Sequence, residues 1–534
     1  MTMQTSGHID TFTREHLPAV SDWPDFRFEL PQLEYPNRLN CAAELLDQNV
    51  ENGLGDRVGI YSAARNISWA ELRCEASRIA HVLVDDMGLV PGNRVLLHGY
   101  NSIELITGWY GVILAGGVAV MTMPMLRAGE IAKVIAKGQV SHALCDTALA
   151  EAVHEAAAQE PVLGRIACWG AEGELTSATA GKPDTFTAAD TARDDIALLA
   201  FTSGTTGEPK ACAHFHSSVL AMADTFAAAV LNPDPDEIYL GTPPFAFTFG
   251  LGACVVFPAR AGLATALPDR PGFEALCETI ERFGVTTLFT APTGYRALMG
   301  LWSRFDLSSL RKGISAGEHL PAATSNAFHE LSGIRLIDGI GATEMIHIFI
   351  SAAGIDIRPG ATGKAVPGYQ ARVVDETGKP VADGEIGRLA VKGPTGCLYL
   401  DDQRQTTYVQ DGWNITGDLY RRDGEGYFRY VARADDLIIS SGYNIAGPEV
   451  EQALLSHEAV LECAVVGAAD DERGTIVKAF IVLTQGHEAC DELVQTLQDH
   501  VKACVAPYKY PRAIEFITAL PKTQTGKIQR FKLR

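Results

Sequence analysis

The sequence lacks the features that would place the protein on a nucleic acid, on a membrane or in an oxidising compartment. Its 44 Lys and Arg residues are outnumbered by 65 Asp and Glu residues, which gives a formal net charge of −21. Because nucleic acids and anionic membranes bind basic surfaces, we expect neither as a partner. None of the eleven cysteines forms a C-x-x-C pair, which favours reduced thiols in a cytoplasmic protein over a zinc site or a disulfide framework. Residues 1–12 contain no apolar segment of the kind found in secretory signals.

Long apolar runs are also scarce, and the one candidate for a membrane span is interrupted. Residues 105–126 carry no charge and are nominally long enough to cross a bilayer. The run contains Gly108, Gly111, Gly116, Gly117 and Pro124, however. The paired glycines predict a short buried helix, a turn and a strand at 118–120 instead of a span.

The length and the order of patterns predict two domains of an α/β protein. At 534 residues the chain can form several cores. Residues 1–430 alternate strand-like runs, such as 94–98, 286–290 and 335–338, with helical patterns, including one opened by the capping box Ser68 and Glu71. Shorter strands are expected at 463–466, 478–483 and 512–517, with a helix over 493–505. We therefore predict a large domain of layered sheets and helices (1–434) and a small α+β domain (435–534).

The strongest functional signal is the segment from Thr202 to Lys210. It follows the apolar run 196–201, which suits a buried strand. Its hydroxyl and glycine residues allow N–H and O–H groups to surround phosphate oxygens, and Lys210 adds a positive charge. The Gly-to-Lys spacing and Ala211 exclude a Walker A loop. For this segment alone, an ordinary surface loop is the alternative.

Four further segments carry polar groups that suit an adenine nucleotide. Residues 339–344 end a predicted strand with a hydroxyl and a carboxylate, and residues 416–418 form a tight turn whose Asp can take both ribose hydroxyls. Residues 433–436 lie at the predicted domain boundary, and residues 521–527 lie in a basic segment near the C-terminus. Taken singly, the four also fit a strand cap, an Asx-turn, a solvated linker and a basic tail.

In this order, the five segments resemble the acyl-adenylate-forming family of acyl-CoA synthetases, adenylation domains and luciferases, and the resemblance covers nearly the whole chain. It implies a mobile C-terminal lid on a hinge. A carboxylic acid would react with Mg·ATP to give acyl-AMP and pyrophosphate, and coenzyme A would then displace AMP to give a thioester. ATP, Mg²⁺, coenzyme A and a small aromatic acid are the implied ligands of a monomer or homodimer.

The resemblance also implies roles for individual residues. Lys527 would bridge the carboxylate and the α-phosphate, Thr343 would touch phosphate, and Glu344 would hold Mg²⁺. Asp418 and Arg433 would bind the ribose, and Asp435 would be the hinge. The other implied nucleotide-binding residues are Thr202, Ser203, Gly204, Thr205, Thr206, Gly207, Lys210, Gly317, Glu318, Asp338, Gly339 and Ile340. The implied walls of the CoA tunnel are Ser441, Gly442 and Tyr443.

Three positions depart from the pattern of the family. Ile340 stands where many members have an aromatic residue, so adenine would meet an aliphatic side chain. Ala432 replaces a frequent glycine, and Ile439 replaces a frequent lysine two positions before Ser441. The last change removes a positive charge near the lid and bears on the thioester step.

Residues 338–350 resemble the benzoate-CoA ligase branch, and residues 10–47 and 442–449 look most like 2-aminobenzoate-CoA ligases. Phe245, Phe247 and Phe249 alternate with small residues, which predicts a strand with three rings on one face, either in the core or in a pocket wall. By resemblance, Phe247 would lie on the ATP side. The implied or candidate acyl-pocket residues are Thr248, Phe249, Tyr295, Gly317, Ile340 and His347, of which the last fits a core histidine equally well.

The residues around this aromatic segment leave the acid open. Residues 244–250 include no Asp or Glu, and a buried ammonium group without a partner is unfavourable. An arylamine is uncharged at neutral pH, so both 2-aminobenzoate and benzoate remain allowed, and resemblance alone favours 2-aminobenzoate. The alternatives are an adenylating enzyme that loads a carrier protein and an ATP-binding sensor, the latter disfavoured by the presence of Lys527 and Glu344.

Overall fold

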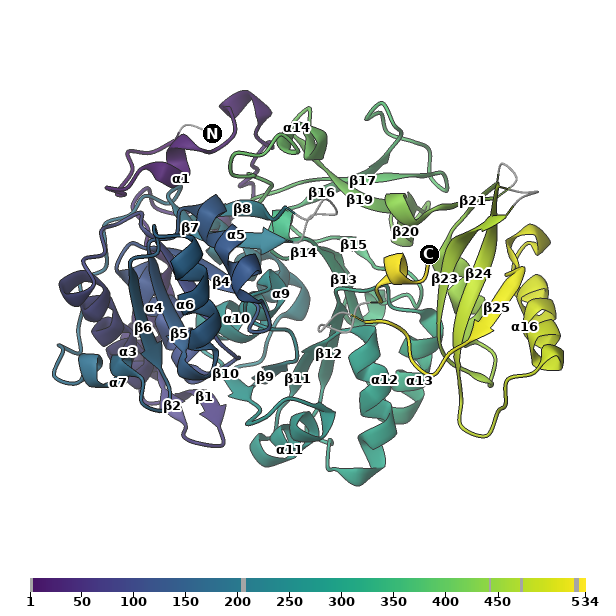
Figure 1. Ribbon diagram of the computed structural model, residues 1–534, viewed down its shortest axis with the longest axis horizontal. Helices are drawn as coiled ribbons and strands as arrows, with labels where there is room; N and C mark the ends of the chain where they lie inside the picture. Colours follow the sequence, from purple (N-terminus) through teal and green to yellow (C-terminus); the bar gives the residue numbers. More distant parts are fainter. Residues whose placement is uncertain (1–2, 203–207, 441–442, 471–473, 523–527) are drawn as a thin grey trace.

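The N-terminal part of the chain is built on two large sheets that lie side by side, with helices between and outside them (Figure 1). The computed structural model describes residues 3–202, 208–440, 443–470, 474–522 and 528–534. In the first sheet, strands β6, β5, β3, β4 and β7 are parallel, and β8 is an antiparallel edge. Their bounds are β3 Arg94–His98, β4 Val118–Thr122, β5 His142–Asp146, β6 Arg165–Trp169, β7 Ile196–Thr202 and β8 Lys210–Phe215.

The second sheet has the order β15-β14-β13-β12-β11-β9-β10-β1-β2. The six strands from β13 to β1 are parallel, while β14, β15 and β2 are antiparallel to their neighbours. The bounds are β1 Val58–Ser62, β2 Ile67–Ser68, β9 Ile238–Gly241, β10 Ala264–Leu267, β11 Thr287–Thr290, β12 Lys312–Ala316, β13 Ile337–Gly341, β14 Ile348–Ser351 and β15 Lys364–Ala365.

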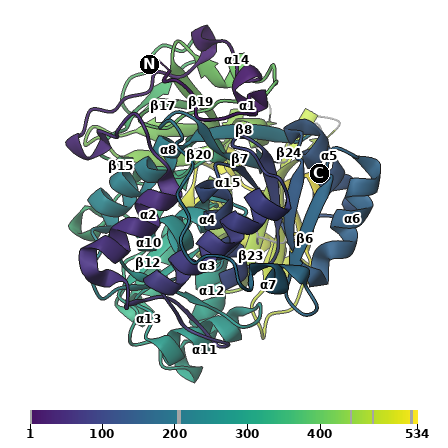
Figure 2. The same ribbon diagram turned by 90° about the vertical axis from the view of Figure 1, so that its left-hand side faces the viewer.

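The helices form three layers around these sheets. One layer lies between the sheets and shares a single apolar core with both of them: α2 Cys41–Asn49, α3 Trp69–His81, α4 Ile103–Leu114, α8 His216–Met222 and α10 Phe257–Ala261. Helices α5 Ala128–Gly138 and α6 Ala150–Gln159 cover the outer face of the first sheet, at the right of Figure 2. The outer face of the second sheet is covered by α11 Phe273–Phe283, α12 Pro292–Leu301 and α13 Ala322–Ser332. This burial of both faces of parallel sheets is the arrangement that α/β patterning predicts.

Two further groups of strands complete the chain. The third sheet, drawn above the other two in Figure 1, contains β16 Gln370–Val374, β17 Ile386–Lys392, β18 Val409–Gln410, β19 Trp413–Arg422 and β20 Phe428–Arg433. The last part contains β21 Ile438–Ser440, β22 Tyr443–Ile445, α15 Gly447–Leu455, β23 Val460–Asp470, β24 Gly474–Leu483, α16 Asp491–Cys504 and β25 Ala513–Phe516. The remaining helices are short: α1 Phe12–Glu15, α7 Glu174–Thr179, α9 Thr248–Leu251 and α14 Gln405–Tyr408.

The predicted α/β class and its small α+β part agree with these elements. The apolar residues between Ile438 and Phe516 form a core of their own, and the boundary between residues 434 and 435 stays a prediction. The uncharged run 105–126 contains most of α4 and all of β4, separated by Gly116 with φ +78°. In the part of the chain that is described, no helix is both long and apolar enough to cross a bilayer. All eleven cysteines are described and are free thiols.

The prediction of a strand through the three alternating phenylalanines is wrong. Strand β9 ends at Gly241, and Phe247 precedes the short helix α9. Pro243 and Pro244 explain the difference, because proline lacks the N–H that a strand in the sheet would need. Phe245 is buried in the core between the sheets, whereas Phe249 packs at its edge.

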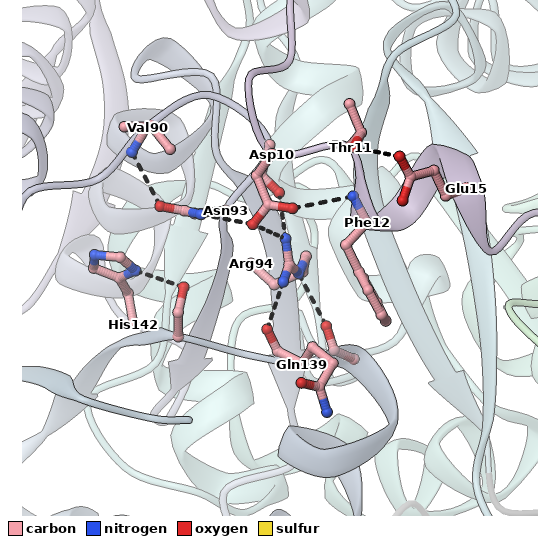
Figure 3. Close-up of polar contacts among 12 residues, drawn as sticks. Asp10, Thr11, Phe12, Glu15, Val90, Asn93, Arg94, Gln139 and His142 are labelled. Carbon is pink, nitrogen blue, oxygen red and sulfur yellow. Dashed lines mark hydrogen bonds and ion pairs between the residues drawn. The ribbon is translucent and has the colours of Figure 1, made fainter. Parts of the chain in front are cut away.

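A buried ion pair fastens the N-terminal segment to the first sheet (Figure 3). Arg94, the first residue of β3, has only 5% of its side chain exposed and donates to Asp10 Oδ2 at 2.5 Å. Its other N–H groups donate to the carbonyl oxygens of Gly138 and Gln139 at 3.0 and 2.7 Å. Asn93 and the backbone N–H of Phe12 also donate to the Asp10 carboxylate. A segment far from the sheet in sequence is therefore held at the end of a central strand.

Candidate active site

The predicted phosphate-binding segment joins two antiparallel strands of the first sheet. Strand β7 ends at Thr202, β8 begins at Lys210, and these two residues pair with each other. Lys210 Nζ donates to the hydroxyl of Tyr399 at 3.2 Å and lies 5.0 Å from the centre of that ring. Five of the predicted residues lie outside the described ones: Ser203, Gly204, Thr205, Thr206 and Gly207.

Glu344 reaches the same place from the second sheet. It belongs to the turn η9 Thr343–Met345, which follows β13 and packs against β7. Its carboxylate accepts a hydrogen bond from the hydroxyl of Tyr399. Lys210 and Glu344, predicted to hold the phosphates and Mg²⁺, therefore share one hydrogen-bonding partner.

Neighbouring strand ends bring together the next group of predicted nucleotide-binding residues. Strands β12 and β13 are parallel, with Ala316 beside Gly339, so their carboxyl ends lie at one edge of the sheet, where α/β proteins commonly bind ligands. This edge carries Gly317, which has φ +87°, together with Glu318, Asp338, Gly339 and Ile340.

Asp338 has an unusual protonation state. Burial raises the pKa of its carboxyl to about 8, against hydrogen bonds from Gly339 and Thr362 that lower it. A carboxyl that keeps its proton near neutral pH both donates and accepts hydrogen bonds.

The two predicted ribose-binding residues face each other across β19 and β20. Asp418 pairs with Arg433 in the strand register, and Arg433 Nη1 lies 3.4 Å from Asp418 Oδ1. The guanidinium group lies directly over Gly417, where an added Cβ would come within 2.6 Å of it. The glycine of this segment therefore gives the arginine room to reach the carboxylate.

His347 is the centre of an aromatic cluster between the two large sheets. Its ring lies 4.6 Å from that of Phe257, 5.6 Å from that of Phe226 and 5.7 Å from that of Phe249. Burial lowers the pKa of the imidazole to about 3, so it is neutral at physiological pH. Its backbone lies against Gly341, at the end of the strand that carries Ile340. Three of the predicted acyl-pocket residues, Phe249, Ile340 and His347, are therefore neighbours in the same region. The buried Thr248 and the half-buried Phe247 precede Phe249 in sequence.

Tyr295, by contrast, lies on the other face of the second sheet. It is completely buried in the core under α11–α13, and its hydroxyl donates to the carbonyl oxygens of Leu288 and Ile314 at 2.8 and 3.0 Å. The second sheet therefore separates Tyr295 from the cluster around His347. The phenol of Tyr295 makes its hydrogen bonds with backbone groups of β11 and β12. A pocket role for Tyr295 gains no support from this position.

Comparison with known proteins identifies the family. The profile of the AMP-binding enzyme family matches residues 46–398, and that of the AMP-binding enzyme C-terminal domain matches residues 449–527. The chain belongs to the AMP-binding enzymes. This membership confirms the resemblance to the acyl-adenylate-forming family.

Several aryl-CoA ligases are similar over nearly the full chain of this AMP-binding enzyme. A benzoate–CoA ligase from Thauera aromatica is 34% identical over 94% of this chain and 97% of its own. An anthranilate CoA ligase, solved in complex with anthranoyl-AMP, has a TM-score of 0.90 and 34% identity and covers 95% of this chain and 98% of its own. A benzoate CoA ligase from Burkholderia xenovorans LB400 has a TM-score of 0.85 and 30% identity, with 93% and 100% covered. The resemblance to the benzoate-CoA ligase branch and the predicted fold class are confirmed, and the protein is an AMP-forming acyl- or aryl-CoA ligase.

The predicted hinge, tunnel and Lys527 stay predictions. Asp435 lies in the turn η11 Ala434–Asp436, between the third sheet and β21, and Tyr443 begins β22. Ser441, Gly442 and Lys527 lie outside the described residues.

Among the described side chains, no group of three or more His, Cys, Asp or Glu is arranged to hold a metal. A single carboxylate such as that of Glu344 nevertheless fits Mg²⁺ bound with a nucleotide, since this ion takes one or two protein carboxylates and fills its other positions with phosphate oxygens and water.

Sequence analysis missed Tyr399, which contacts both Lys210 and Glu344. It lies between β17 and α14, outside the segments identified in the sequence analysis. The only available signal was the short apolar run 397–400 before Asp401 and Asp402, which is typical of a strand and not of a site.

Proposed function

We propose that this enzyme activates an aromatic carboxylic acid, with 2-aminobenzoate as the preferred acid, and transfers the acyl group to coenzyme A. The observation that carries the proposal is the meeting of Lys210 from the first sheet and Glu344 from the second at the hydroxyl of Tyr399. This meeting provides a cation and a metal-binding carboxylate beside the segment predicted to bind phosphate. Asp418 and Arg433 supply a ribose-binding pair on the third sheet.

The proposed reaction has two steps. A carboxylate oxygen of the acid attacks the α-phosphorus of ATP, and pyrophosphate leaves with the electrons of the broken P–O bond. The thiolate of coenzyme A then attacks the acyl carbon, and AMP leaves. Both reactants of the first step are negatively charged, so neutralisation of charge is the main task of the site.

The chain supplies several of the charges that this task requires. Lys210 would hold terminal phosphate oxygens, and Lys527 would lie between the acid and the α-phosphate. Mg²⁺ bound by Glu344 and by phosphate oxygens would neutralise the triphosphate further. Asp418 and Arg433 would fix the ribose and so direct the α-phosphate toward the acid.

The aromatic cluster around His347 supports an aryl substrate. Phe249 is only partly buried and lies at the edge of this cluster, where it could border an aryl group, whereas Phe226 and Phe257 are buried in the core, and the imidazole of His347 is uncharged. Residues 244–250 include no carboxylate, so an ammonium group buried there would lack a partner, which costs several kcal/mol. The uncharged amine of 2-aminobenzoate avoids this cost. The similarity to an anthranilate CoA ligase, together with the resemblance of residues 10–47 and 442–449, favours this acid over benzoate.

A panel of benzoates with amino, hydroxyl or no substituents at each ring position tests the choice of acid. Acid-dependent release of pyrophosphate and formation of the CoA thioester would be measured as kcat/KM. We expect 2-aminobenzoate to give the highest value, and a higher value for benzoate or a hydroxybenzoate would refute this choice. Formation of AMP with a carrier protein but not with free coenzyme A would refute the proposed acceptor.

A further inference from the structure

Burial and backbone hydrogen bonds fix the position of Tyr399. Its side chain is completely buried. The segment around it pairs with β8: Ala213 N–H donates to the Leu398 carbonyl at 2.8 Å, and Leu400 N–H donates to the Ala211 carbonyl at 2.9 Å. The backbone N–H of Tyr399 itself donates to Gln405 Oε1 at 2.9 Å. The ring therefore has a fixed position relative to the strand that begins with Lys210.

The hydroxyl of Tyr399 has one charged partner of each sign. It donates to the carboxylate of Glu344 and accepts a hydrogen bond from the ammonium group of Lys210 at 3.2 Å. A phenol is a donor and an acceptor at once, and it keeps its proton at neutral pH. One oxygen atom can thus hold both groups in place while each keeps its charge available for a ligand. In a direct Lys–Glu ion pair, the two charges would instead neutralise each other.

The two partners come from different sheets, which also meet here through the packing of the turn η9 against β7. Lys210 begins the edge strand of the first sheet, whereas Glu344 lies in a turn after β13 of the second. Catalytic groups must be held within a fraction of an ångström of the productive geometry, and neighbouring hydrogen bonds commonly provide that precision. Tyr399 is in the position to do so for these two.

We propose that Tyr399 is a positioning residue that holds Glu344 and Lys210 in the arrangement that receives metal-bound ATP. The proposal rests on the proposed function, since it assigns Glu344 and Lys210 to the metal and the phosphates. Tyr399 acts through these two residues and does not itself touch the reacting atoms. Its loss therefore weakens the binding of metal-bound nucleotide and slows adenylation, and it leaves the transfer of a finished acyl group to coenzyme A unchanged.

The variant Tyr399→Phe removes one oxygen atom and keeps the ring. Binding of Mn²⁺ with a non-hydrolysable ATP analogue would be followed by the paramagnetic signal of Mn²⁺, which needs no catalysis. We expect binding to weaken about 10-fold, the usual effect of losing a hydrogen bond to a charged group. Pyrophosphate release should fall at limiting Mg²⁺, whereas thioester formation from supplied acyl-AMP should stay within about 2-fold of the wild-type rate, because that step involves neither the triphosphate nor its metal ion.

Tyr408→Phe is the matched control, because its ring packs edge-on against Tyr399 at 5.8 Å. It removes a phenol oxygen from the same cluster but leaves the contacts of Tyr399 in place, so we expect normal binding and rate. A double-mutant cycle of Tyr399→Phe and Glu344→Gln adds a second test. If Tyr399 acts through Glu344, the losses in nucleotide binding are not additive.

The outcomes separate this inference from the proposed function. Normal Mn²⁺-nucleotide binding in Tyr399→Phe, equal losses in Tyr399→Phe and Tyr408→Phe, or additive losses in the cycle would each refute the positioning role. A wild-type protein that binds the nucleotide but releases no pyrophosphate with any aryl acid would refute the proposed function instead. If Tyr399→Phe unfolds at a lower temperature than Tyr408→Phe and binds normally once folded, Tyr399 is a packing residue.

Discussion

Replacement of Asp10 by alanine gives a direct measure of how the N-terminal segment is held. The change leaves the Arg94 guanidinium, of which 5% is exposed, without its carboxylate. Removing one member of a buried ion pair typically costs about 3–5 kcal/mol. Because Arg94 keeps its hydrogen bonds to the carbonyl oxygens of Gly92, Gly138 and Gln139, we expect the lower end, about 3 kcal/mol.

Glu15→Ala is the control for this experiment. Glu15 lies in the same segment, but its carboxylate is exposed and bonds only to the hydroxyl of Thr11 among the contacts drawn in Figure 3. Its loss should change the free energy of unfolding by no more than about 0.5 kcal/mol. Urea unfolding gives the global effect, and amide hydrogen exchange over residues 8–16 shows whether the segment detaches first. If the two variants unfold and exchange alike, the ion pair does not fasten the segment.

The effect of Asp10→Ala should also depend on pH in one direction. Burial opposes ionisation of Asp10, but hydrogen bonds from Phe12 and Arg94 outweigh it, so the pKa of this carboxyl lies below its usual value. The stabilisation is therefore complete above the pKa of about 3.9 that the unfolded chain has, and it is lost as the pH falls through the lower folded value. The difference between wild type and variant should be constant from neutral pH to about pH 5 and should shrink below about pH 4. A difference that grows on acidification would contradict the assignment of the pair.

Two further predictions separate the two half-reactions. Lys527→Ala should abolish acyl-AMP formation but still convert supplied acyl-AMP to the thioester, and equal loss of both rates would contradict the role of Lys527. Gly442→Trp should fill the predicted pantetheine tunnel, so that pyrophosphate is released for about one turnover and the adenylate then accumulates. An unchanged steady-state rate of thioester formation in that variant would show that the tunnel lies elsewhere.

Local interactions explain why part of the fold could be predicted. The capping box needs only Ser68 and Glu71, three residues apart, and the structure has both of its hydrogen bonds, at 2.8 and 3.2 Å. The break after α4 is also local. Gly116 has φ +78°, a conformation that commonly follows the end of a helix and that glycine adopts with little strain. The strand prediction for the phenylalanine segment was wrong because it ignored the residues that precede the pattern. Its period of two was real, but the two prolines before it removed the backbone donors that a strand requires.

The site shows a different limit. The predicted role of each motif residue could be assigned from its neighbours in sequence, because phosphate, ribose and metal binding each need particular side chains in a short segment. Tyr399 belongs to no such segment, and its two contacts span 189 residues to Lys210 and 55 residues to Glu344. Contacts of that kind exist only after the sheets have packed, so they leave no local pattern.

Pairs such as Asp418 and Arg433 are intermediate between the local motifs, which sequence reveals, and Tyr399, which it does not. They occur in separate motifs, yet antiparallel pairing of β19 and β20 makes them neighbours. Where two motifs end up on adjacent strands, each can be identified from sequence and the register alone decides whether they meet. Where they end up on different sheets, as Lys210 and Glu344 do, a third residue must connect them, and that residue is the one that sequence motifs do not reveal. In this enzyme Tyr399 makes hydrogen bonds to both, so if the proposed roles of Lys210 and Glu344 hold, the precision of adenylation should depend on a side chain that binds no substrate.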